Sequence, residues 1–472
     1  MKIVIIGAGI AGCAAYLELR KHLPKPSPQE PDHEIVIFEA YSTGVDETDE
    51  SREEGHTHSS TLLVGGGLGI APNGLGVLQR LDEDLLRDVT RGGYVTSHSN
   101  LRDKNGRLLM RIEPNASTQK TDGGPALGMY TVATSRHSFW RCMRARIPDH
   151  HIINKRVLEV IVNSEGRNVV RFVDGGDPVE ADLVIGADGV RSTAKRALFP
   201  DDEEDLYPPR YEGLVGVGGF VPAADVKDIV ETGSMNFVFG GNGFFGYFFS
   251  DSASSAAHRD SPYHVSKPGE SLAWWSTYAI KECPDRKTLD MDDVTRQLRE
   301  RHVYWRDPVV QKVMESMTIR NMYPTWTLPP LPTWEQNGVV LLGDAAHALP
   351  STSGQGSSQA LEDCESFALF LAHHLGKAAQ EQDTTTTASL KAAINKAAKQ
   401  YVALRQPRVK EILEAAQRMQ NTKRDMGVIQ EYTMYTFMKI LGFFPGLAAG
   451  PMKKVGEYNV AERVAQLLAS ES

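Results

Sequence analysis

The chain alternates between short, β-branched apolar runs and longer segments whose apolar residues recur at helical spacing. Four of the short runs are residues 2–6, 34–38, 181–186 and 338–342. Runs this apolar are typical of parallel strands that are buried on both faces. The first run is followed at once by a helical pattern over residues 13–19. This order of strand, turn and helix predicts an α/β fold built on an open, doubly wound sheet.

A second group of runs is aromatic and rich in glycine, at residues 211–221, 235–250 and 271–280. No helical pattern separates them, which predicts a second, mainly antiparallel sheet. An amphipathic helix is predicted over 291–302, and helices continue after the polar linker at 380–387. We therefore predict three parts, listed by residue number: a discontinuous first domain of 1–70, 130–200 and 335–378, a second domain of 71–129 and 201–334, and a helical region of 379–472.

The turn after the first strand carries Gly7, Gly9 and Gly12 in G-x-G-x-x-G spacing. The first glycine permits a tight turn, the second lets the backbone approach a pyrophosphate, and the third allows close packing of helix and strand. The helix N-terminus also attracts phosphate. The second strand ends at Glu39, whose carboxylate can bind a ribose 2′-OH. Together these residues predict a dinucleotide with an unphosphorylated adenosine ribose; a βαβ unit without ligand is the alternative.

Two later apolar strands also end in an acidic residue beside glycine, at Asp188-Gly189 and at Gly343-Asp344. The carboxyl end of a parallel strand is where open α/β sheets bind ligands. A turn at 351–356 then leads into a long helix, whose N-terminus suits an anionic group. The glycines at 65–69 would either lie against a flat ligand or form a crossover loop without one, and the residues alone do not choose between the two.

Composition narrows the class of protein. The formal net charge of −9 argues against non-specific nucleic-acid binding. The four cysteines show no C-x-x-C or metal-type spacing, so we expect reduced thiols, no metal site and a cytoplasmic protein. We expect His56 and His58, in an acidic loop at 41–60, to be solvated. No transmembrane segment is predicted; the apolar stretch at 434–449 is interpreted as a core or interface helix, with weak peripheral membrane contact as the alternative.

The ordered set of Gly7-x-Gly9-x-x-Gly12, Asp188-Gly189 and Gly343-Asp344 resembles the FAD-dependent aromatic monooxygenases of the para-hydroxybenzoate hydroxylase type, the class A flavoprotein monooxygenases. The resemblance extends to about residue 380. Further matches are Pro72-Asn73, Arg136, and the segment Tyr401-x-x-x-Arg405-x-Pro407-Arg408. The resemblance implies a Rossmann-like FAD-binding domain, a β-sheet substrate domain and a C-terminal helical region.

The resemblance also implies a chemistry and a set of cofactor contacts. NADPH or NADH would reduce FAD, and O2 would form a flavin C4a-hydroperoxide that oxygenates a flat aromatic or indole/quinolone-like molecule of secondary metabolism. The protein would be a monomer or homodimer. The FAD-binding residues would be Gly7, Gly9, Gly12, Glu39, Gly67, Arg136, Asp188, Gly343, Asp344, Gly354, Gly356 and Ser357.

The substrate pocket is predicted between the flavin and the second sheet. Its candidate walls are Phe244, Tyr247, Trp275 and Pro350, and the candidate catalytic residues are Arg191 and Tyr247, with His347 as a further acid–base candidate. Some members of the family hold a phenolate with an arginine in the strand that corresponds to 214–221. This chain has no charged residue at 216–220, which predicts binding by stacking and apolar burial.

Two rival functions remain open at this stage. A flavin-dependent halogenase would share the fold but carries a W-x-W-x-I-P signature, which Trp326-Thr327-Leu328-Pro329 does not match. A non-catalytic flavoprotein that serves as a binding module would keep every cofactor motif. NADPH oxidation that depends on substrate distinguishes this second rival from an enzyme.

Overall fold

The structure of the 472-residue chain is a computed structural model. The described residues are 1–25, 32–43, 66–113, 120–121, 124–125, 128–200, 204–285, 288–381 and 386–471. Most of the acidic loop, with His56 and His58, and the first glycine of the run at 65–69 therefore lie outside the described residues.

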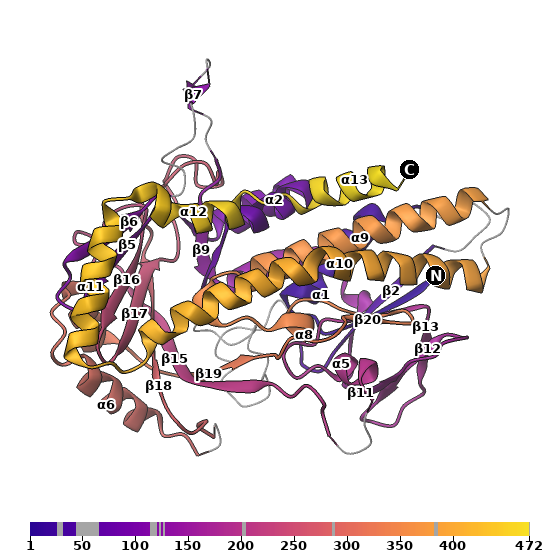
Figure 1. Cartoon of the computed structure of the whole chain (residues 1–472), viewed down its shortest axis with the longest axis horizontal. Helices are drawn as coiled ribbons and strands as arrows, with labels where there is room; N and C mark the ends of the chain where they lie inside the picture. Colours follow the sequence, from indigo (N-terminus) through magenta and orange to yellow (C-terminus); the bar gives the residue numbers. More distant parts are fainter. Residues whose placement is uncertain are drawn as a thin grey trace.

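The first body is built on a six-stranded sheet (Figure 1). Its strand order is β10 (Ile152–Asn154), β2 (Glu34–Glu39), β1 (Lys2–Ile6), β14 (Leu183–Gly186), β21 (Val339–Leu341) and β20 (Glu335–Gln336). Every neighbouring pair is parallel except β20 with β21. The apolar runs thus form the central strands, because only strands covered on both faces can bury such sequences. The predicted α/β class is confirmed.

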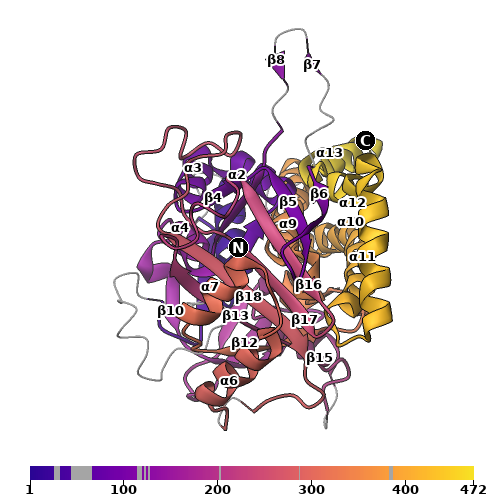
Figure 2. The same ribbon diagram turned by 90° about the vertical axis from the view of Figure 1, so that its left-hand side faces the viewer.

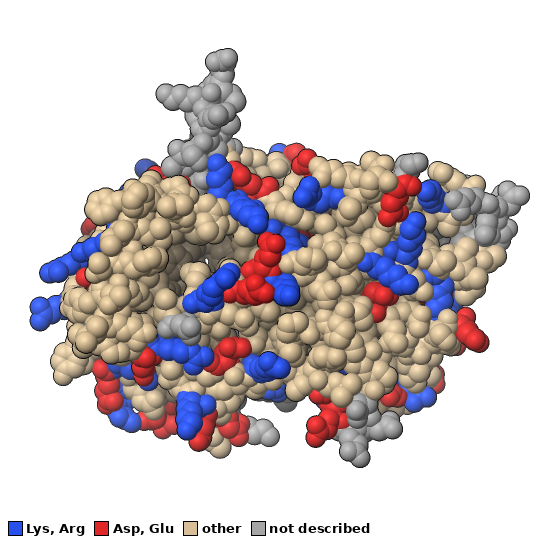
Figure 3. Space-filling view, viewed as in Figure 1, with Lys and Arg blue, Asp and Glu red and all other residues tan. Residues whose placement is uncertain are grey.

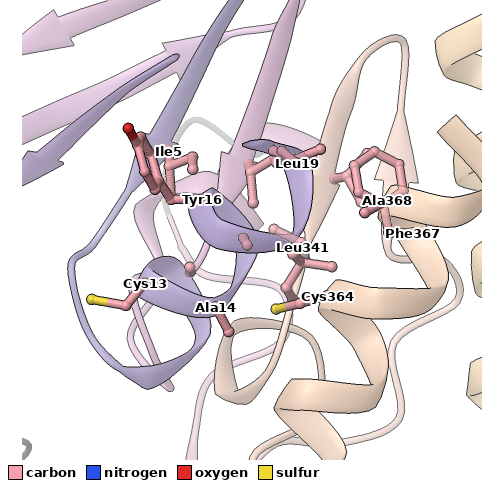
Figure 4. Close-up of a cluster of buried hydrophobic side chains, with 14 of the residues drawn as sticks. Ile5, Cys13, Ala14, Tyr16, Leu19, Leu341, Cys364, Phe367 and Ala368 are labelled. Carbon is pink, nitrogen blue, oxygen red and sulfur yellow. The ribbon is translucent and has the colours of Figure 1, made fainter. Parts of the chain in front are cut away.

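Helices stack in layers on one face of this sheet. The helix α1 (Ile10–His22) lies on the strands, α9 (Gly356–Glu381) packs on α1, and α10 (Thr387–Gln420) packs on α9. Figure 4 shows Ala14 and Leu19 of α1 between the sheet and the buried Cys364 and Phe367 of α9. On the other side lies a small antiparallel sheet of β11 (Val157–Ile161), β12 (Asn168–Phe172) and β13 (Val179–Ala181), with α5 (Thr193–Leu198) against β11.

A seven-stranded sheet forms the second body (Figure 2). Its order is β19 (Met322–Thr327), β15 (Arg210–Pro222), β18 (Ser271–Ala279), β17 (Gly243–Phe249), β16 (Ser234–Gly240), β5 (His98–Asp103) and β6 (Leu108–Ile112). Only β16 and β5 pair in parallel, so the predicted, mainly antiparallel second sheet is confirmed. The single run predicted over 235–250 is a hairpin, because the chain reverses between Gly240 and Gly243.

Each face of the second sheet has its own cover. The helices α6 (Met291–His302) and α7 (Pro308–Ser316) pack on one face. A bridging sheet packs on the other: β3 (Gly67–Ile70), β9 (Thr131–Ser135) and β4 (Tyr94–Thr96). The helix α4 (Arg136–Arg144) follows β9 and joins the bridging sheet to the first body, where it packs on α1.

Helices on both sides of the predicted domain boundaries at residues 71 and 379 share one hydrophobic core. The helices α2 (Pro72–Leu81) and α3 (Glu83–Arg91) bury Leu78 and Leu85 in the same core as α1 and α9. The helices α10 and α13 (Val460–Ser470) add Tyr401 and Val464 to that core. Helical periodicity shows that a face is buried but does not show which partner buries it, so the sequence alone does not indicate this shared packing.

Two late helices carry an exposed apolar face. α11 (Val428–Gly442) buries Tyr435 and Met438 against β5 and β6, and α12 (Pro445–Gly456) follows it. The exposed apolar face consists of Ile429, Tyr432, Phe437, Ile440, Phe443, Phe444 and Leu447, with exposed fractions up to 85%. Figure 3 shows few charged side chains over this region. None of the helices in the described part of the chain has the length and hydropathy needed to cross a bilayer.

Candidate cofactor and substrate site

The glycine turn is forced into its shape by its neighbours. Gly7 has φ of +98°, and a Cβ there would lie 2.6 Å from the Ala187 carbonyl oxygen. A Cβ on Gly12 would overlap the Gly7 carbonyl oxygen. Gly9 is the N-cap of α1 without any side-chain cap, and no described group accepts from the N–H groups of Ile10 and Ala11. The turn is therefore a bare, donor-rich cradle that fits a pyrophosphate.

Glu39 lies beside this turn, as the sequence predicts. Its carboxylate accepts hydrogen bonds from the backbone N–H groups of Ala8 (2.7 Å) and Tyr41 (3.0 Å). Burial raises the pKa of Glu39, while these N–H groups oppose the rise. The Trp140 indole donates to the Ala8 carbonyl at 2.7 Å, so the Ala8 peptide is held from both sides. Trp140 supports the turn directly, a role that its helical core spacing does not reveal.

Asp344 and Arg136 come from distant parts of the chain and face the same cleft. Asp344 is the first residue of α8 (Asp344–His347), and Gly343 before it has φ of +61°. The Asp344 side chain is exposed, yet the surrounding protein raises its pKa by desolvation, and His347 and Arg136 oppose that rise. We interpret this carboxylate, which water reaches but protein surrounds, as the floor of a cleft. The Arg136 side chain also lies against Gly66, just before β3.

The N-terminus of α9 follows α8 after a short loop. η2 (Ser351–Ser353) leads to Gly354, which has φ of +58°, and α9 begins at Gly356. Open space surrounds the Cβ positions of both glycines. Among the described groups, none accepts from the N–H groups of Gly356 and Ser357. A helix end with free donors stabilises negative charge, which suits the ring of a reduced flavin.

A buried network of charges holds the two cofactor-side segments together. Asp363 of α9 accepts from the Gly343 N–H (3.0 Å), His347 Nε2 (2.5 Å) and Arg405 Nε (2.8 Å). Burial alone would raise the pKa of Asp363, but His347 and Arg405 outweigh it and hold the pKa below its usual range. His347 is thus occupied by Asp363 and also packs on the ring of Trp334, which leaves it a structural group rather than an acid–base residue of the pocket.

Glu362 extends this network to three helices. Its carboxylate accepts from Asn73 Nδ2 of α2 (2.6 Å), from Arg408 Nε of α10 (2.8 Å), and from Arg405. Arg405, Glu362 and Asp363 are fully buried. The Tyr401 hydroxyl donates to the Leu341 carbonyl at the end of β21 (2.9 Å). The matches at Pro72-Asn73 and in the late helix therefore converge on one cluster, whose acidic members the sequence reasoning missed.

Two predicted site residues have other partners. Asp188 caps α5, accepting from the Ser192 hydroxyl (2.5 Å) and the Thr193 N–H (2.6 Å). The Arg191 side chain is exposed, and its guanidinium lies 5.2 Å from the centroid of the Trp326 ring. Asp188 keeps its place beside the glycine turn, because the Ala187 N–H bonds the Ile6 carbonyl. Nothing in the surroundings of Arg191 supports the predicted catalytic role.

The Tyr247 side chain lies on the face of the second sheet that α6 and α7 cover, so its surroundings do not support the predicted catalytic and pocket roles. It packs in the core under α6 and α7, and its hydroxyl hydrogen-bonds with Asp307. Phe244 and Trp275 lie on the face that meets the bridging sheet, and their ring centroids are 6.0 Å apart. Alternation sends neighbouring residues of β17 to opposite faces, and both faces are buried, so the sequence does not reveal which one faces the cofactor.

The face that carries Trp275 meets the cofactor side directly. A Cβ on Gly67 of β3 would lie 2.6 Å from Phe248 Cζ. Gly218 pairs with Trp275 in the sheet, so β15 presents bare backbone there. Pro350 is buried at the start of the cofactor loop (residues 350–355), which leads through η2 to α9. Partly exposed apolar side chains on this face are Phe220, Met235, Phe237 and Trp275. Figure 3 shows the surface hollowed beside α11, below α12. Such a face fits a flat apolar ligand.

Replacing Asp344 with alanine should weaken FAD binding by about tenfold to a hundredfold, because one charge-assisted hydrogen bond is lost. The overall fold should persist, since the side chain is exposed in the cleft. Fluorescence titration of FAD-stripped protein measures the affinity. Asp292→Ala, in the first turn of α6 on the far face of the second sheet, is the matched control. Wild-type affinity in Asp344→Ala would contradict the assignment.

Comparison with known proteins agrees with this geometry. The family model described as "FAD binding domain" matches residues 153–402, more than half of the chain. Zeaxanthin epoxidase from Oryza sativa subsp. japonica is 26% identical over 370 residues, which cover 77% of this chain and 47% of that protein. FAD-dependent monooxygenase nodY2 from Hypoxylon pulicicidum is 26% identical over 400 residues, covering 79% and 75%. The chain spans about half the length of the zeaxanthin epoxidases it matches.

Solved structures share the fold. HpxO from Klebsiella pneumoniae, complexed with FAD and uric acid, is 20% identical with a TM-score of 0.67, covering 93% of this chain and 92% of that one. A salicylate hydroxylase substrate complex is 18% identical with a TM-score of 0.68, covering 98% and 97%. FAD fits the glycine cradle, the Asp344 cleft and the free N-terminus of α9. The chain therefore belongs to the FAD binding domain family.

Proposed function

We propose that the protein is an FAD-dependent monooxygenase that consumes NADPH or NADH and O2. It inserts one oxygen atom into a flat aromatic or indole/quinolone-like small molecule in secondary metabolism. The second oxygen atom leaves as water, and the nicotinamide cofactor leaves oxidised. The contact between the glycine strand β3 and the aromatic face of the second sheet carries this proposal, because it brings Phe248 against Gly67 of the cofactor side. The relatives named as monooxygenases support it.

Different residues of the chain would bind different parts of FAD and the substrate. Gly7, Gly9, Gly12 and Glu39 would hold the adenosine diphosphate half of FAD, while Asp344 and Arg136 would hold the middle of the molecule. FAD, when bound, supplies the activation of O2. The free N–H groups at the start of α9 would stabilise negative charge on the reduced ring. The aromatic face would orient the substrate and exclude water, which prevents oxidising equivalents from being lost to solvent.

A substrate panel tests this function. Protein loaded with FAD is incubated with NADPH or NADH and with phenols, indoles and quinolones, while cofactor oxidation and product mass are recorded. We expect stimulated oxidation and a product heavier by one oxygen atom. A chlorinated product in the presence of chloride would favour the halogenase, and FAD binding without any stimulation would favour the binding module.

Replacing Trp275 with alanine should show whether this side chain belongs to the substrate pocket or to the core of the second sheet. Trp275 is partly exposed on the cofactor face, so its loss should lower substrate-stimulated NADPH oxidation, or divert it to hydrogen peroxide, with little change in FAD content. Trp274 is buried on the opposite face and stacks on Phe245, so Trp274→Ala should cost about 3–5 kcal/mol of stability. Thermal unfolding and peroxide assays distinguish the two. Equal loss of stability in both variants would contradict the proposed pocket.

We also propose a cytoplasmic location with weak peripheral membrane contact through the exposed apolar face of α11 and α12. The four cysteines are all unpaired, which fits a reducing compartment. The outward side of α11 carries Phe437 and Ile440 beside a single exposed lysine, Lys439, a pattern that suits a lipid interface. Phe437→Glu should therefore reduce co-sedimentation with anionic vesicles. Equal sedimentation of variant and wild type would exclude the contact.

A further inference from the structure

A buried lysine closes the substrate side of the site. Lys423 is the last residue of η3 (Asn421–Lys423), directly after α10, and only 8% of it is exposed. Its Nζ lies 4.2 Å from the centroid of the Phe244 ring. Phe244 is in turn a neighbour of Trp275, which also contacts Phe248 with ring centroids 5.6 Å apart. Lys423 therefore adjoins the aromatic face that meets Gly67 and the cofactor side.

The same end of α10 also contacts the cofactor loop. The Thr352 hydroxyl of η2 donates to the Ala416 carbonyl of α10 at 3.1 Å. One turn later, Gln420 is 4% exposed, and its Nε2 group is buried without a hydrogen-bond partner among the described residues. Gln420 and Lys423 are three residues apart, a spacing that places side chains on one side of a helix. Gln420 and Lys423 thus lie at the end of α10 that reaches the cofactor loop through Ala416 and the aromatic face through Lys423.

No described carboxylate pairs with Lys423. The charged side chains around it have other partners: Arg424 donates to the Glu212 carbonyl, Asp425 pairs with Arg301, and Glu431 pairs with Lys104. Burial alone lowers the pKa of Lys423 to about 8, with no opposing carboxylate. The side chain is therefore still an ammonium at neutral pH.

Gln420 Nε2 is a buried donor without an acceptor among the described residues, and the Lys423 ammonium contacts the Phe244 ring but no described carboxylate. Buried polar and charged groups of this kind lower the stability of a protein unless a partner binds them. A flat ring stacked on Trp275 and Phe244 would bring its substituents to this end of the pocket. We propose that Lys423 and Gln420 form an anion-recognition site, and that the substrate is a flat aromatic molecule that bears an oxyanion, either a carboxylate or a phenolate. This inference rests on the proposed function, because it takes the aromatic pocket as the substrate site.

The test compares probes of equal shape and different charge on the FAD-loaded, oxidised protein, without turnover. 1-Naphthoate and 1-naphthamide differ in charge but not in ring, and both are compared at a pH where Lys423 is an ammonium. Changes in flavin absorbance give the dissociation constants. At pH 7 we expect 1-naphthoate to bind about tenfold to a hundredfold more tightly than 1-naphthamide, as one charge-assisted hydrogen bond allows.

Matched variants test whether Lys423 and Gln420 cause the preference for 1-naphthoate over 1-naphthamide. Lys423→Met should remove the preference for 1-naphthoate and change the affinity for 1-naphthamide by less than about threefold. Lys423→Arg should retain most of the preference, and Gln420→Leu should lose a smaller part of it. Lys439→Met, at an exposed lysine of α11, is the control and should bind both probes like wild type. FAD content is recorded for every variant, because an intact cofactor site shows that the fold is retained.

Thermal stability supplies a second readout that needs no probe. The pKa of Lys423 is about 8 in the folded protein against 10.5 in its ordinary environment, so the unfolded chain binds this proton more tightly. The buried ammonium therefore lowers stability below pH 8, and the penalty fades as pH rises from 8 toward 10.5. Lys423→Met should melt above wild type at pH 7, and the difference should shrink at pH 10.

The outcomes separate this inference from the function on which it rests. Failure of both naphthalene probes to bind would contradict the aromatic pocket and with it the proposed function. Tight binding of 1-naphthamide, equal to that of 1-naphthoate, would overturn the anion site and leave the pocket intact. An undiminished preference for 1-naphthoate in Lys423→Met would likewise overturn the assignment to Lys423.

Discussion

Gly12→Val should abolish stable FAD binding. A Cβ at this position already overlaps the Gly7 carbonyl oxygen, which is backbone and has no rotamer by which to move away. The first turn of α1 must therefore separate from β1, and the cradle of N–H groups at Gly9 to Ala11 is lost. We expect the purified variant to be colourless and its FAD affinity to fall by more than about a hundredfold, as measured by fluorescence titration.

A glycine elsewhere in the same body provides the control. Gly376 lies inside α9 with open space around its Cβ position, so Gly376→Ala should bind FAD normally and gain roughly 0.5–1 kcal/mol from helix propensity. Normal FAD content in Gly12→Val would show that the turn does not form the pyrophosphate site.

The second large effect is expected at Arg405. Its guanidinium is fully buried and bonds Asp363, Glu362 and the Gln359 side chain. Arg405→Met leaves two buried carboxylates short of a cation, which typically costs about 3–5 kcal/mol. Because Asp363 holds the Gly343 N–H, the cofactor segment before Asp344 should loosen as well. Denaturant unfolding measures the first effect, and FAD affinity measures the second.

Two further variants keep this prediction testable if Arg405→Met fails to fold. Adding Glu362→Gln to Arg405→Met removes one of the stranded charges and should restore part of the stability. The exposed pair of Lys454 and Glu411 is the matched surface case, and Lys454→Met should change stability by less than roughly 0.5 kcal/mol. If Arg405→Met also changed stability by less than roughly 0.5 kcal/mol, the result would contradict a structural role for the buried charge network.

The fold can be predicted from the sequence where a pattern of residues is compatible with only one kind of structure. Runs such as that of β1 can be buried only between two layers, and G-x-G-x-x-G after a strand has few other uses. The hairpin of β16 and β17 is harder to predict, because the sequence from Phe239 to Phe244 resembles one continuous aromatic strand. The chain reverses there through glycines and Asn242 alone. The packing of α2, α3 and α10 on the first body is also not evident from the sequence, because the pattern of an amphipathic helix does not show which element covers its apolar face.

The candidate site residues also fall into those that the sequence can predict and those that it cannot. Gly7, Gly12, Glu39 and Asp344 were predicted from their position at strand ends, where topology decides the neighbours. Tyr247 and Trp275 could not be sorted, since both faces of the second sheet are covered. Lys423 follows Thr422 and precedes Arg424-Asp425, so in the sequence it resembles one more residue of a solvated polar loop. Only the packing of α10 on the sheet shows that it is buried.

The order of strands in the central sheet has a consequence for synthesis on the ribosome. β1 forms early, yet its neighbour β14 comes from residues 183–186, β21 from 339–341, and the same core is completed by Val460 and Val464 of α13. At about 5–20 residues per second, roughly 20–90 seconds separate β1 from α13. During that interval the nascent chain carries unpaired parallel strands that cannot yet be buried, which makes it a natural client for chaperones that shield such segments.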